Sequence, residues 1–247
     1  MREITDAVVL MAGTGSRLRA SGETLPKPLI PISGRPLICH IVEGLEKVGI
    51  QNLHVVVGAD GDELVTALRP LIPPAMRLEA IANPSWQKQN GISVLCAEGK
   101  VKEPFFLTMG DHLFDASILN CVIEQGNTSE LNLAVDRKIA AIFDLDDAMK
   151  VQTHGDRIVA IGKNLRAYDA IDTGLFVCPV QIFEYLEEAR ENDDCSLADG
   201  VRLMAAEGKA RVVDIGDAWW QDVDTPEMFE QAEKHLAAKS ALPTSAR

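Results

Sequence analysis

The sequence predicts an α/β fold in which a doubly wound, mostly parallel central sheet is followed by a small antiparallel lobe. Apolar runs of about five residues without polar alternation recur through the first half, which is typical of strands buried on both faces. Amphipathic helical patterns separate these runs, and the alternation implies βαβ units. After residue 126 the pattern changes to short strand-like segments with turn signals between them.

The first half alternates regularly. Strands are expected at 7–11, 52–57, 77–82 and 104–109, and helices at 36–48, 61–69, 91–98 and 115–124. Pro36 suits a helix start, and Gly49 ends that helix. Because ligands of parallel sheets bind at the carboxyl ends of the strands, the residues that follow 7–11 and 104–109 are expected to share a site.

The second half is expected to begin with an antiparallel lobe and to end in a helix. Short strands are expected at 131–135, 148–152, 157–161, 211–215 and 218–224, and helices at 179–190, at 196–207 and from Thr225 onward. Segment 139–147 should be a loop or an edge strand. Segment 162–176 is assigned to the lobe, which we expect to bind a substrate.

Composition restricts the classes of function. The 247 residues carry a net charge of −13 and are 47% hydrophobic, which allows one sizeable core and argues against a nucleic-acid partner. The five cysteines are far apart and form no Cys-x-x-Cys pair, so neither a zinc site nor a disulfide framework is expected. With no signal-peptide pattern and no apolar run long enough to cross a bilayer, we expect a cytoplasmic protein without a transmembrane segment.

The first strand ends in a loop of small residues that suits a phosphate group. Ala12, Gly13 and Gly15 let backbone N–H groups approach an anion closely. Two common phosphate loops do not fit, because position 18 is Leu instead of the third Gly of Gly-x-Gly-x-x-Gly and no Gly-Lys-Ser/Thr follows. A tight strand-to-helix turn is the structural alternative.

Two cations follow this loop. Arg17 offers a planar fork of donors to phosphate oxygens. Lys27 is a point charge whose backbone is restricted by Pro26 and Pro28. The alternative is a proline-rich surface loop that binds no ligand. This alternative is disfavoured because both cations occur together with the small residues of the loop.

Carboxylates stand at two later positions where strands end. Asp111 follows the 104–109 strand on a glycine turn, where it is well placed to hold Mg²⁺ against phosphate oxygens. Capping of the next helix is its alternative, although Asp115 can also cap that helix. Asp222 and Asp224 fall on one strand face, and Asp224 precedes the last helix, so a helix-capping turn is the alternative for Asp224.

Three further positions suit ligand contacts. Asn90-Gly91 opens a helix, which leaves backbone N–H groups and a carboxamide free to face a ligand, or makes Asn90 an ordinary N-cap. Trp86 either stacks on a base or anchors a hydrophobic contact. His112 either touches a substrate or only packs, and Lys163 lies just past a strand, where it can neutralise a phosphate.

The paired motifs resemble the sugar-1-phosphate nucleotidylyltransferase superfamily. Its usual opening, Leu-Ala-Gly-Gly-x-Gly-Thr-Arg-Leu followed by Lys-Pro, corresponds here to Met11-Ala-Gly-Thr-Gly-Ser-Arg-Leu18 with Lys27-Pro28. Four further motifs are similar to those of CTP:inositol-1-phosphate cytidylyltransferases, namely Gly110-Asp-His112, Asn90-Gly-Ile-Ser93, Gly162-Lys-x-Leu165 with Tyr168-Asp-Ala-Ile-Asp-Thr-Gly174, and Asp222-Val-Asp-Thr-Pro226. The resemblance covers nearly the whole chain.

The resemblance implies a fold, a domain plan and a set of site residues. The fold is Rossmann-like, of the nucleotide-diphospho-sugar transferase type, with one domain over 1–240, a nucleotide-binding half at 1–125, an acceptor-binding half at 126–225, a C-terminal helix at 226–240 and a tail at 241–247. The implied site consists of the catalytic residues Arg17, Lys27 and Asp111, the nucleotide-binding residues Ala12, Gly13, Thr14, Gly15, Ser16, Asn90 and Gly91, the substrate-binding residues Lys163, Asp172, Thr173 and Gly174, and the Mg²⁺ ligands Asp111 and Asp224. One departure concerns Lys163, because the superfamily lysine stands in Glu-Lys-Pro and this one in Gly162-Lys-Asn164.

The implied reaction joins CTP to a phosphorylated polyol or sugar, with inositol 1-phosphate the first choice, and releases pyrophosphate. Arg17 and Lys27 would then stabilise the departing pyrophosphate. The alternatives are another sugar-1-phosphate or phosphocholine-type nucleotidyltransferase and a non-catalytic nucleotide-binding regulator. A glycosyltransferase is disfavoured, because Gly110-Asp-His112 stands where its Asp-x-Asp is expected.

The base and the assembly state are not fixed by the residues. No side chain in the sequence encodes cytosine over uracil or guanine, so CTP rests on the resemblance. In that family the domain is often fused to a membrane CDP-alcohol phosphotransferase, and we expect a separate protein of that kind to use the product here. A homo-oligomer is left open.

Overall fold

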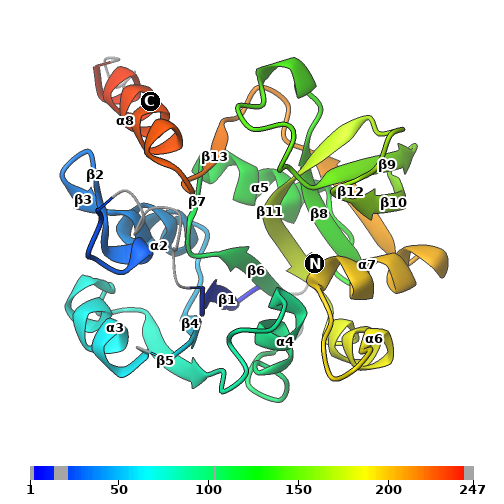
Figure 1. The fold of residues 1–247 in the computed structure, drawn as a ribbon, viewed down its shortest axis with the longest axis horizontal. Helices are drawn as coiled ribbons and strands as arrows, with labels where there is room; N and C mark the ends of the chain where they lie inside the picture. The colour runs from blue at the N-terminus through cyan, green and yellow to red at the C-terminus, as the bar shows by residue number, and fades with distance from the viewer. Residues whose placement is uncertain (1–2, 14–21, 60, 103, 242–247) are drawn as a thin grey trace.

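A computed structural model describes residues 3–13, 22–59, 61–102 and 104–241 (Figure 1). Its centre is one mixed sheet of nine strands in the order β5-β4-β1-β6-β11-β8-β12-β10-β9. The strands are β1 (Asp6–Met11), β4 (Asn52–Val57), β5 (Arg77–Ala82), β6 (Phe105–Met109), β8 (Leu131–Asp136), β9 (Lys150–His154), β10 (Arg157–Gly162), β11 (Ala170–Cys178) and β12 (Ala210–Asp214). Strands β5, β4, β1 and β6 are mutually parallel and include the phosphate-loop strand.

The antiparallel strands extend the same sheet. Strand β11 runs antiparallel to both β6 and β8, and β10 runs antiparallel to β12 and β9. The predicted α/β class with its small antiparallel strands is therefore confirmed, and the two parts share one sheet.

Seven helices in the described residues cover both faces of the sheet. They are α2 (Leu37–Lys47), α3 (Gly61–Leu68), α4 (Asn90–Leu95), α5 (Ala116–Gln125), α6 (Ile182–Ala189), α7 (Leu197–Ala206) and α8 (Pro226–Ala241). Helices α2, α3, α5 and α8 pack on one face, and α4, α6 and α7 pack on the other. In β1, Val9 packs on the first group and Val8 on the second, which explains why the strand shows no polar alternation.

Short elements complete the fold. Two-residue strands β2 (Pro31–Ile32) and β3 (Arg35–Pro36) form a ribbon, and β7 (His112–Phe114) pairs with β13 (Trp220–Asp222) away from the main sheet. Single 3-10 turns are η1 (Lys27–Leu29), η2 (Arg69–Leu71) and η3 (Ile139–Ala141). Segment 139–147 is therefore a loop with a 3-10 turn, and of the two predictions for it, a loop or an edge strand, the loop is confirmed.

One strand of the main sheet was missed in the sequence. Segment 162–176 was assigned to the lobe as a whole, but Ala170–Cys178 is a strand at the centre of the sheet. A bulge between Asp172 and Phe176 hides the strand pattern, and Gly174 has a φ of +73° within it. This bulge becomes important at the site.

The helix starts partly follow the prediction. Ser196 and Asp199 form a capping box on α7, and the Thr225 hydroxyl accepts from the Met228 N–H at the start of α8. Asp115 stands at the N-cap of α5 without capping it, because its carboxylate accepts instead from the Trp219 N–H and from Lys239. Helix α4 ends at Leu95, three residues before the expected end.

Candidate active site

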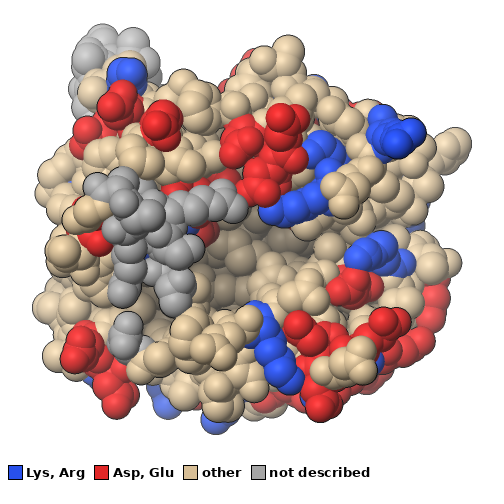
Figure 2. Space-filling view, viewed as in Figure 1, with Lys and Arg blue, Asp and Glu red and all other residues tan. Residues whose placement is uncertain are grey.

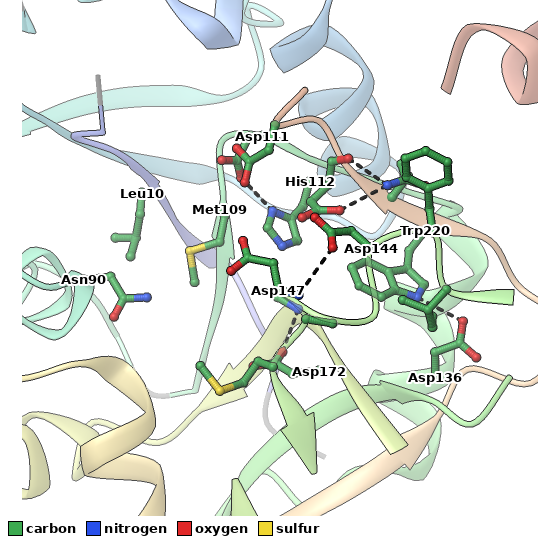
Figure 3. Close-up of a pocket in the computed structure, with 18 of the residues that line it drawn as sticks. Leu10, Asn90, Met109, Asp111, His112, Asp136, Asp144, Asp147, Asp172 and Trp220 are labelled. Atoms are coloured by element: carbon green, nitrogen blue, oxygen red, sulfur yellow. Dashed lines mark hydrogen bonds and ion pairs between the residues drawn. The ribbon is translucent and has the colours of Figure 1, made fainter. Parts of the chain in front are cut away.

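A cavity of about 540 Å³ opens at the carboxyl ends of β1 and β6. Figure 2 shows the hollow at the centre of this face of the molecule, with acidic side chains and cationic ones on its rim. The close-up in Figure 3 places Asn90 and Leu10 on one side of the cavity and Asp136 and Trp220 on the other. The location matches the strand-end site that the alternating pattern predicted.

Lys27 joins two carboxylates beside this cavity. Its Nζ atom lies 2.7 Å from Asp111 Oδ2 and also contacts Asp224 Oδ1. The side chain of Lys27 is 9% exposed, whereas those of Asp111 and Asp224 are 28% and 29% exposed. Three residues that the sequence singled out, separated by up to 197 positions, are thus in direct contact.

The ribbon of β7 and β13 brings the two carboxylates together. His112 pairs with Asp222 in this ribbon, and the Val223 N–H donates to the Asp111 carbonyl (3.0 Å). Asp111 itself is placed by the end of β6, where the Gly110 N–H donates to the Leu10 carbonyl (2.9 Å). Gly110 has no room for a side chain, because a Cβ atom would lie 2.7 Å from Met11 Cγ.

The charges of this cluster stabilise one another. Burial raises the pKa of Asp111, but the Lys27 ammonium and His112 outweigh burial and hold that pKa well below its usual range. Burial lowers the pKa of Lys27, but Asp111 and Asp224 outweigh it and raise that pKa. Lys27 is therefore a permanent cation and Asp111 a permanent anion near neutral pH.

His112 is held on three sides. Its Nδ1 atom lies 2.6 Å from Asp111 Oδ1, and its ring stacks on Trp220 with 6.1 Å between ring centroids. On the third side, a Cβ atom on Gly174 would lie 2.4 Å from His112 Cδ2, so the glycine of the β11 bulge makes room for the ring. His112 therefore packs against its neighbours and orients Asp111, and its contact with a substrate stays a prediction.

Asp172 enters the cavity from the same bulge. Its Oδ1 atom accepts from the Gly174 N–H (2.7 Å), and burial raises the pKa of the carboxyl to about 6, against the opposing effect of that N–H and of His112. Lys163, also on the cavity wall, lies 2.5 Å from Asp147. These two predicted substrate-binding residues therefore face one cavity with Asp111.

Thr173 and Gly91 have other roles in the structure. Thr173 is 1% exposed and its hydroxyl donates to the Ala134 carbonyl, because neighbouring residues of a strand point to opposite faces. Gly91 packs against the loop before α7, since a Cβ atom would lie 2.6 Å from the Cys195 carbonyl oxygen. The Thr173 side chain is therefore not placed to contact a substrate in the cavity, which corrects the prediction for this side chain. Packing explains why position 91 has no side chain.

Asn90 is oriented by a contact that the sequence did not suggest. It is the first residue of α4, after Gln89 at the N-cap, so the N-cap alternative for Asn90 is wrong. Its Oδ1 atom accepts from the Leu197 N–H (2.8 Å), at the start of α7. Asn90 lines the cavity, and the carboxamide nitrogen remains to face a ligand.

Part of the predicted phosphate loop is placed and part is not described. Ala12 and Gly13 line the cavity, and Trp86 stands beside them on its wall. Thr14, Gly15, Ser16 and Arg17 lie outside the described residues.

Three residues of the cavity were missed in the sequence. Asp136, Lys138 and Trp220 line it, and Figure 3 shows Asp136 and Trp220 at the end away from Asn90. Asp136 is the last residue of the buried strand β8, so the reasoning from strand ends that found Asp111 would have identified it as well. For Trp220 no sequence signal was available, because its place depends on the pairing of β13 with β7.

The donor set suits a divalent metal that also binds phosphate. Among the described residues no group of three or more His, Cys, Asp or Glu side chains is arranged to hold a metal ion alone. Asp111 and Asp224 already share one cationic partner, and two carboxylates completed by substrate oxygens are a usual set for Mg²⁺. The residues present therefore fit a metal bound together with a nucleotide.

Comparison with known proteins identifies the family. Residues 7–143 match the MobA-like NTP transferase domain, which is more than half of the chain. The chain belongs to this family. It is accordingly a nucleotidyltransferase, and such enzymes generally use a divalent metal.

Curated relatives extend the similarity over nearly the whole chain. The "Bifunctional IPC transferase and DIPP synthase" of Aquifex aeolicus (strain VF5) is 34% identical over 97% of this chain and 53% of the relative. The protein of the same name from Archaeoglobus fulgidus is 29% identical over 96% of this chain and 44% of the relative. The chain thus spans about half the length of these curated relatives.

Solved structures agree in fold. The inositol-1-phosphate CTP transferase from T. maritima matches with a TM-score of 0.83 and 28% identity, covering 94% of this chain and 96% of that one. The UDP-glucose pyrophosphorylase from Acinetobacter baumannii matches with a TM-score of 0.78 and 19% identity, covering 96% and 95%, which shows the fold alone. Among the described helices, none combines the length and apolar character that a membrane crossing requires.

Proposed function

We propose that this protein is a CTP:inositol-1-phosphate cytidylyltransferase that joins CTP and inositol 1-phosphate into CDP-inositol and pyrophosphate. The observation that carries the proposal is the contact of Lys27 with both Asp111 and Asp224 at the carboxyl ends of the parallel strands. The choice of CTP and inositol 1-phosphate is supported by the T. maritima transferase of that name and by the relatives named IPC transferase.

The reaction is an in-line displacement at phosphorus. An oxygen of the acceptor's phosphate monoester forms a bond to the α-phosphorus of CTP, the bond from that phosphorus to the bridging oxygen breaks, and pyrophosphate leaves with the electron pair. The attacking phosphate is already an anion near pH 7, so no side chain has to remove a proton. The chain's residues then act by positioning and by stabilising charge.

Each side chain of the cluster has a separate task. Lys27 supplies positive charge beside the α-phosphate and the departing pyrophosphate, together with Arg17. Asp111 and Asp224 would hold Mg²⁺, which supplies positive charge to the phosphate oxygens when bound. His112 keeps Asp111 oriented through the 2.6 Å contact with Oδ1, which leaves Oδ2 for a cation.

The nucleotide and the acceptor occupy opposite ends of the cavity. Ala12, Gly13 and Asn90 lie at the nucleotide end, where the Asn90 amide nitrogen donates to an acceptor atom of the base. Asp172 and Lys163 lie at the acceptor end, where Asp172 accepts from hydroxyl groups. Lys163 serves the acceptor phosphate by exchanging its contact with Asp147 for one with the substrate.

Pyrophosphate release tests the proposal. The purified protein is incubated with CTP, Mg²⁺ and inositol 1-phosphate, and released pyrophosphate is measured with each component omitted in turn. Release that requires all three is expected. A panel with UTP and GTP in place of CTP, and with glucose 1-phosphate and phosphocholine as acceptors, distinguishes the related reactions. Turnover with glucose 1-phosphate and UTP, but not with inositol 1-phosphate, would contradict the proposal.

Several expectations from the sequence stay predictions. These are the division into nucleotide-binding and acceptor-binding halves, the cytoplasmic location and the homo-oligomer. A membrane CDP-alcohol phosphotransferase that uses the product also stays a prediction, supported by the second activity in the printed name of the relatives and by their greater length.

A further inference from the structure

The acceptor end of the cavity has an aromatic wall. Trp220 is half-buried and lines the cavity together with Ile142 and Met149. Four carboxylates, those of Asp144, Asp147, Asp172 and Asp222, line the same cavity. The cavity therefore offers a bound molecule an indole, apolar side chains and several hydrogen-bond acceptors.

The indole is fixed in place along its polar edge. Trp220 Nε1 donates to Asp136 Oδ2 (3.0 Å), and Asp136 is only 4% exposed. The other oxygen of Asp136 accepts from the Lys138 N–H (2.7 Å) and lies 3.0 Å from Lys138 Nζ. Because a buried carboxylate without partners is costly, this set of contacts holds Asp136, and Asp136 holds the indole.

Lys138 and the β13 backbone complete the support. Lys138 Nζ also donates to the carbonyl oxygens of Gly216 (2.5 Å) and Ala218 (3.2 Å), just before β13. Trp220 itself pairs with Phe114 across the β7–β13 ribbon, and its ring stacks on His112. The ribbon that brings Asp224 to Asp111 therefore also sets the position of the indole relative to the reacting groups.

The chemistry of this wall selects a type of acceptor. Since these four carboxylates repel further negative charge, we expect the phosphate of an acceptor to point toward Lys163 on the cavity wall and Lys27 beside it, and the uncharged part to point toward Trp220. A polyhydroxylated ring exposes C–H groups on its faces and hydroxyl groups around its edge. Its face suits an indole, and its edge suits these carboxylates.

We propose that Trp220 is a specificity-determining residue of the acceptor site, and that its indole, fixed by Asp136 and Lys138, packs against the ring of a cyclic polyol phosphate. The inference rests on the proposed function and goes further, because it separates cyclic from acyclic acceptors. Choline is the competing acceptor, because an indole among carboxylates also suits a quaternary ammonium group, and phosphocholine is therefore included in the test.

Kinetics with two acceptors test the inference. Inositol 1-phosphate is compared with glycerol 3-phosphate, which has a similar phosphate and hydroxyl groups but no ring. Trp220→Leu should raise the KM for inositol 1-phosphate about tenfold or more, while the KM values for CTP and for glycerol 3-phosphate stay within about twofold. Trp220→Phe, which keeps a flat ring, should lie between wild type and Trp220→Leu. Phe229→Leu is the matched control, because it makes the same aromatic-to-leucine change at a partly buried ring of α8 that does not line the cavity.

A binding measurement separates this inference from the proposed function. The variant Trp86→Phe/Trp219→Phe keeps Trp220 as its sole tryptophan, since the chain has three. Its fluorescence should change on addition of inositol 1-phosphate and should not change on addition of glycerol 3-phosphate at the same concentration. If the wild-type protein releases pyrophosphate with none of the phosphate esters, the proposed function fails. The fluorescence titration alone then shows whether Trp220 contacts a cyclic polyol phosphate.

Three results would overturn the inference. The first is an equal rise in KM for both acceptors in Trp220→Leu. The second is a preference of wild type for phosphocholine over inositol 1-phosphate, and the third is a Trp220 fluorescence that does not change on addition of inositol 1-phosphate. Thermal unfolding of each variant is measured alongside. A Trp220→Leu protein that does not fold leaves the decision to Trp220→Phe and to the titration.

Discussion

Lys27 Nζ lies 2.7 Å from Asp111 Oδ2, and the same ammonium contacts the carboxylate of Asp224. The Lys27 ammonium thus holds together the two carboxylates that we propose as ligands of a second cation, Mg²⁺. Since the three residues come from η1, from the end of β6 and from the end of β13, their meeting depends on the fold as a whole. The contact leads to two predictions about charge in the site.

The first prediction concerns competition between Lys27 and a metal ion. Lys27→Met removes the ammonium from between the carboxylates, so the nucleotide-free protein should bind Mn²⁺ more tightly than wild type, by about tenfold. Turnover should nevertheless fall more than about a hundredfold, because the charge beside the phosphates is lost. Mn²⁺ titration followed by electron paramagnetic resonance measures the affinity. Lys234→Met, on the exposed face of α8, is the control. Unchanged Mn²⁺ affinity in Lys27→Met would show that Lys27 does not occupy the metal position.

The second prediction concerns the carboxylates. Asp111→Asn and Asp224→Asn keep the side-chain shape and remove the charge, so each should lower turnover more than about a hundredfold while the fold remains intact. Circular dichroism and pyrophosphate release are measured on the same preparations. Asp193→Asn, at an exposed turn, should behave as wild type. Near-normal turnover of either site variant would remove that residue from the mechanism.

The strand ends explain how much of this site could be predicted. Ala12, Gly13 and Asp111 each come directly or shortly after a largely apolar run, and parallel strands place such positions at one edge, so the sequence already predicted that they lie together. The similarity of the Asp222-Val-Asp-Thr-Pro226 stretch to a known family then added Asp224. The structure confirms the fold class and places Lys27 between Asp111 and Asp224.

The remaining residues depend on pairings that leave no local pattern. Strand β11 was missed because its bulge interrupts the alternation, and the same bulge turns Asp172 toward the cavity while Thr173 faces Ala134. Trp220 reaches the cavity only because β13 pairs with β7 across more than a hundred residues of chain. Local periodicity carries no information about either pairing.

The third prediction concerns Gly174 in the bulge of β11. Gly174→Ala places a methyl group 2.4 Å from His112 Cδ2 at a φ of +73°, so it combines backbone strain with a clash against the ring that orients Asp111. Gly155→Ala is the matched control, because Gly155 has a φ of +61° and nothing within 4 Å of the added Cβ atom. The control should lose about 1 kcal/mol of unfolding free energy and keep its activity.

Gly174→Ala should lose more than the control, and it should also lose turnover because His112 and Asp111 shift. Urea denaturation and pyrophosphate release are the two measurements. Equal losses of stability in both variants, with turnover retained in Gly174→Ala, would mean that the space beside His112 has no effect on the site.

The fourth prediction concerns the pH dependence of Asp172. Burial raises the pKa of this carboxyl from 3.8 to about 6, so the folded protein binds the proton more tightly than the unfolded chain does. The stabilisation from the protonated carboxyl is complete below about pH 4 and is lost as the pH rises through about 6. The unfolding free energy of wild type minus that of Asp172→Asn should therefore decrease between pH 4 and pH 7. Urea denaturation at several pH values measures this difference.

The same ionisation should appear in acceptor binding. Above pH 6 the ionised Asp172 accepts hydrogen bonds from acceptor hydroxyls with both oxygens, so the KM for the acceptor should fall as the pH rises from about 5 to 7. Asp172→Asn has no charge to gain, and its acceptor KM should keep only the pH dependence of the substrate phosphate. The KM for CTP, whose proposed site lies at the other end of the cavity, serves as the internal control. Parallel pH profiles for wild type and Asp172→Asn would exclude Asp172 from contact with the acceptor.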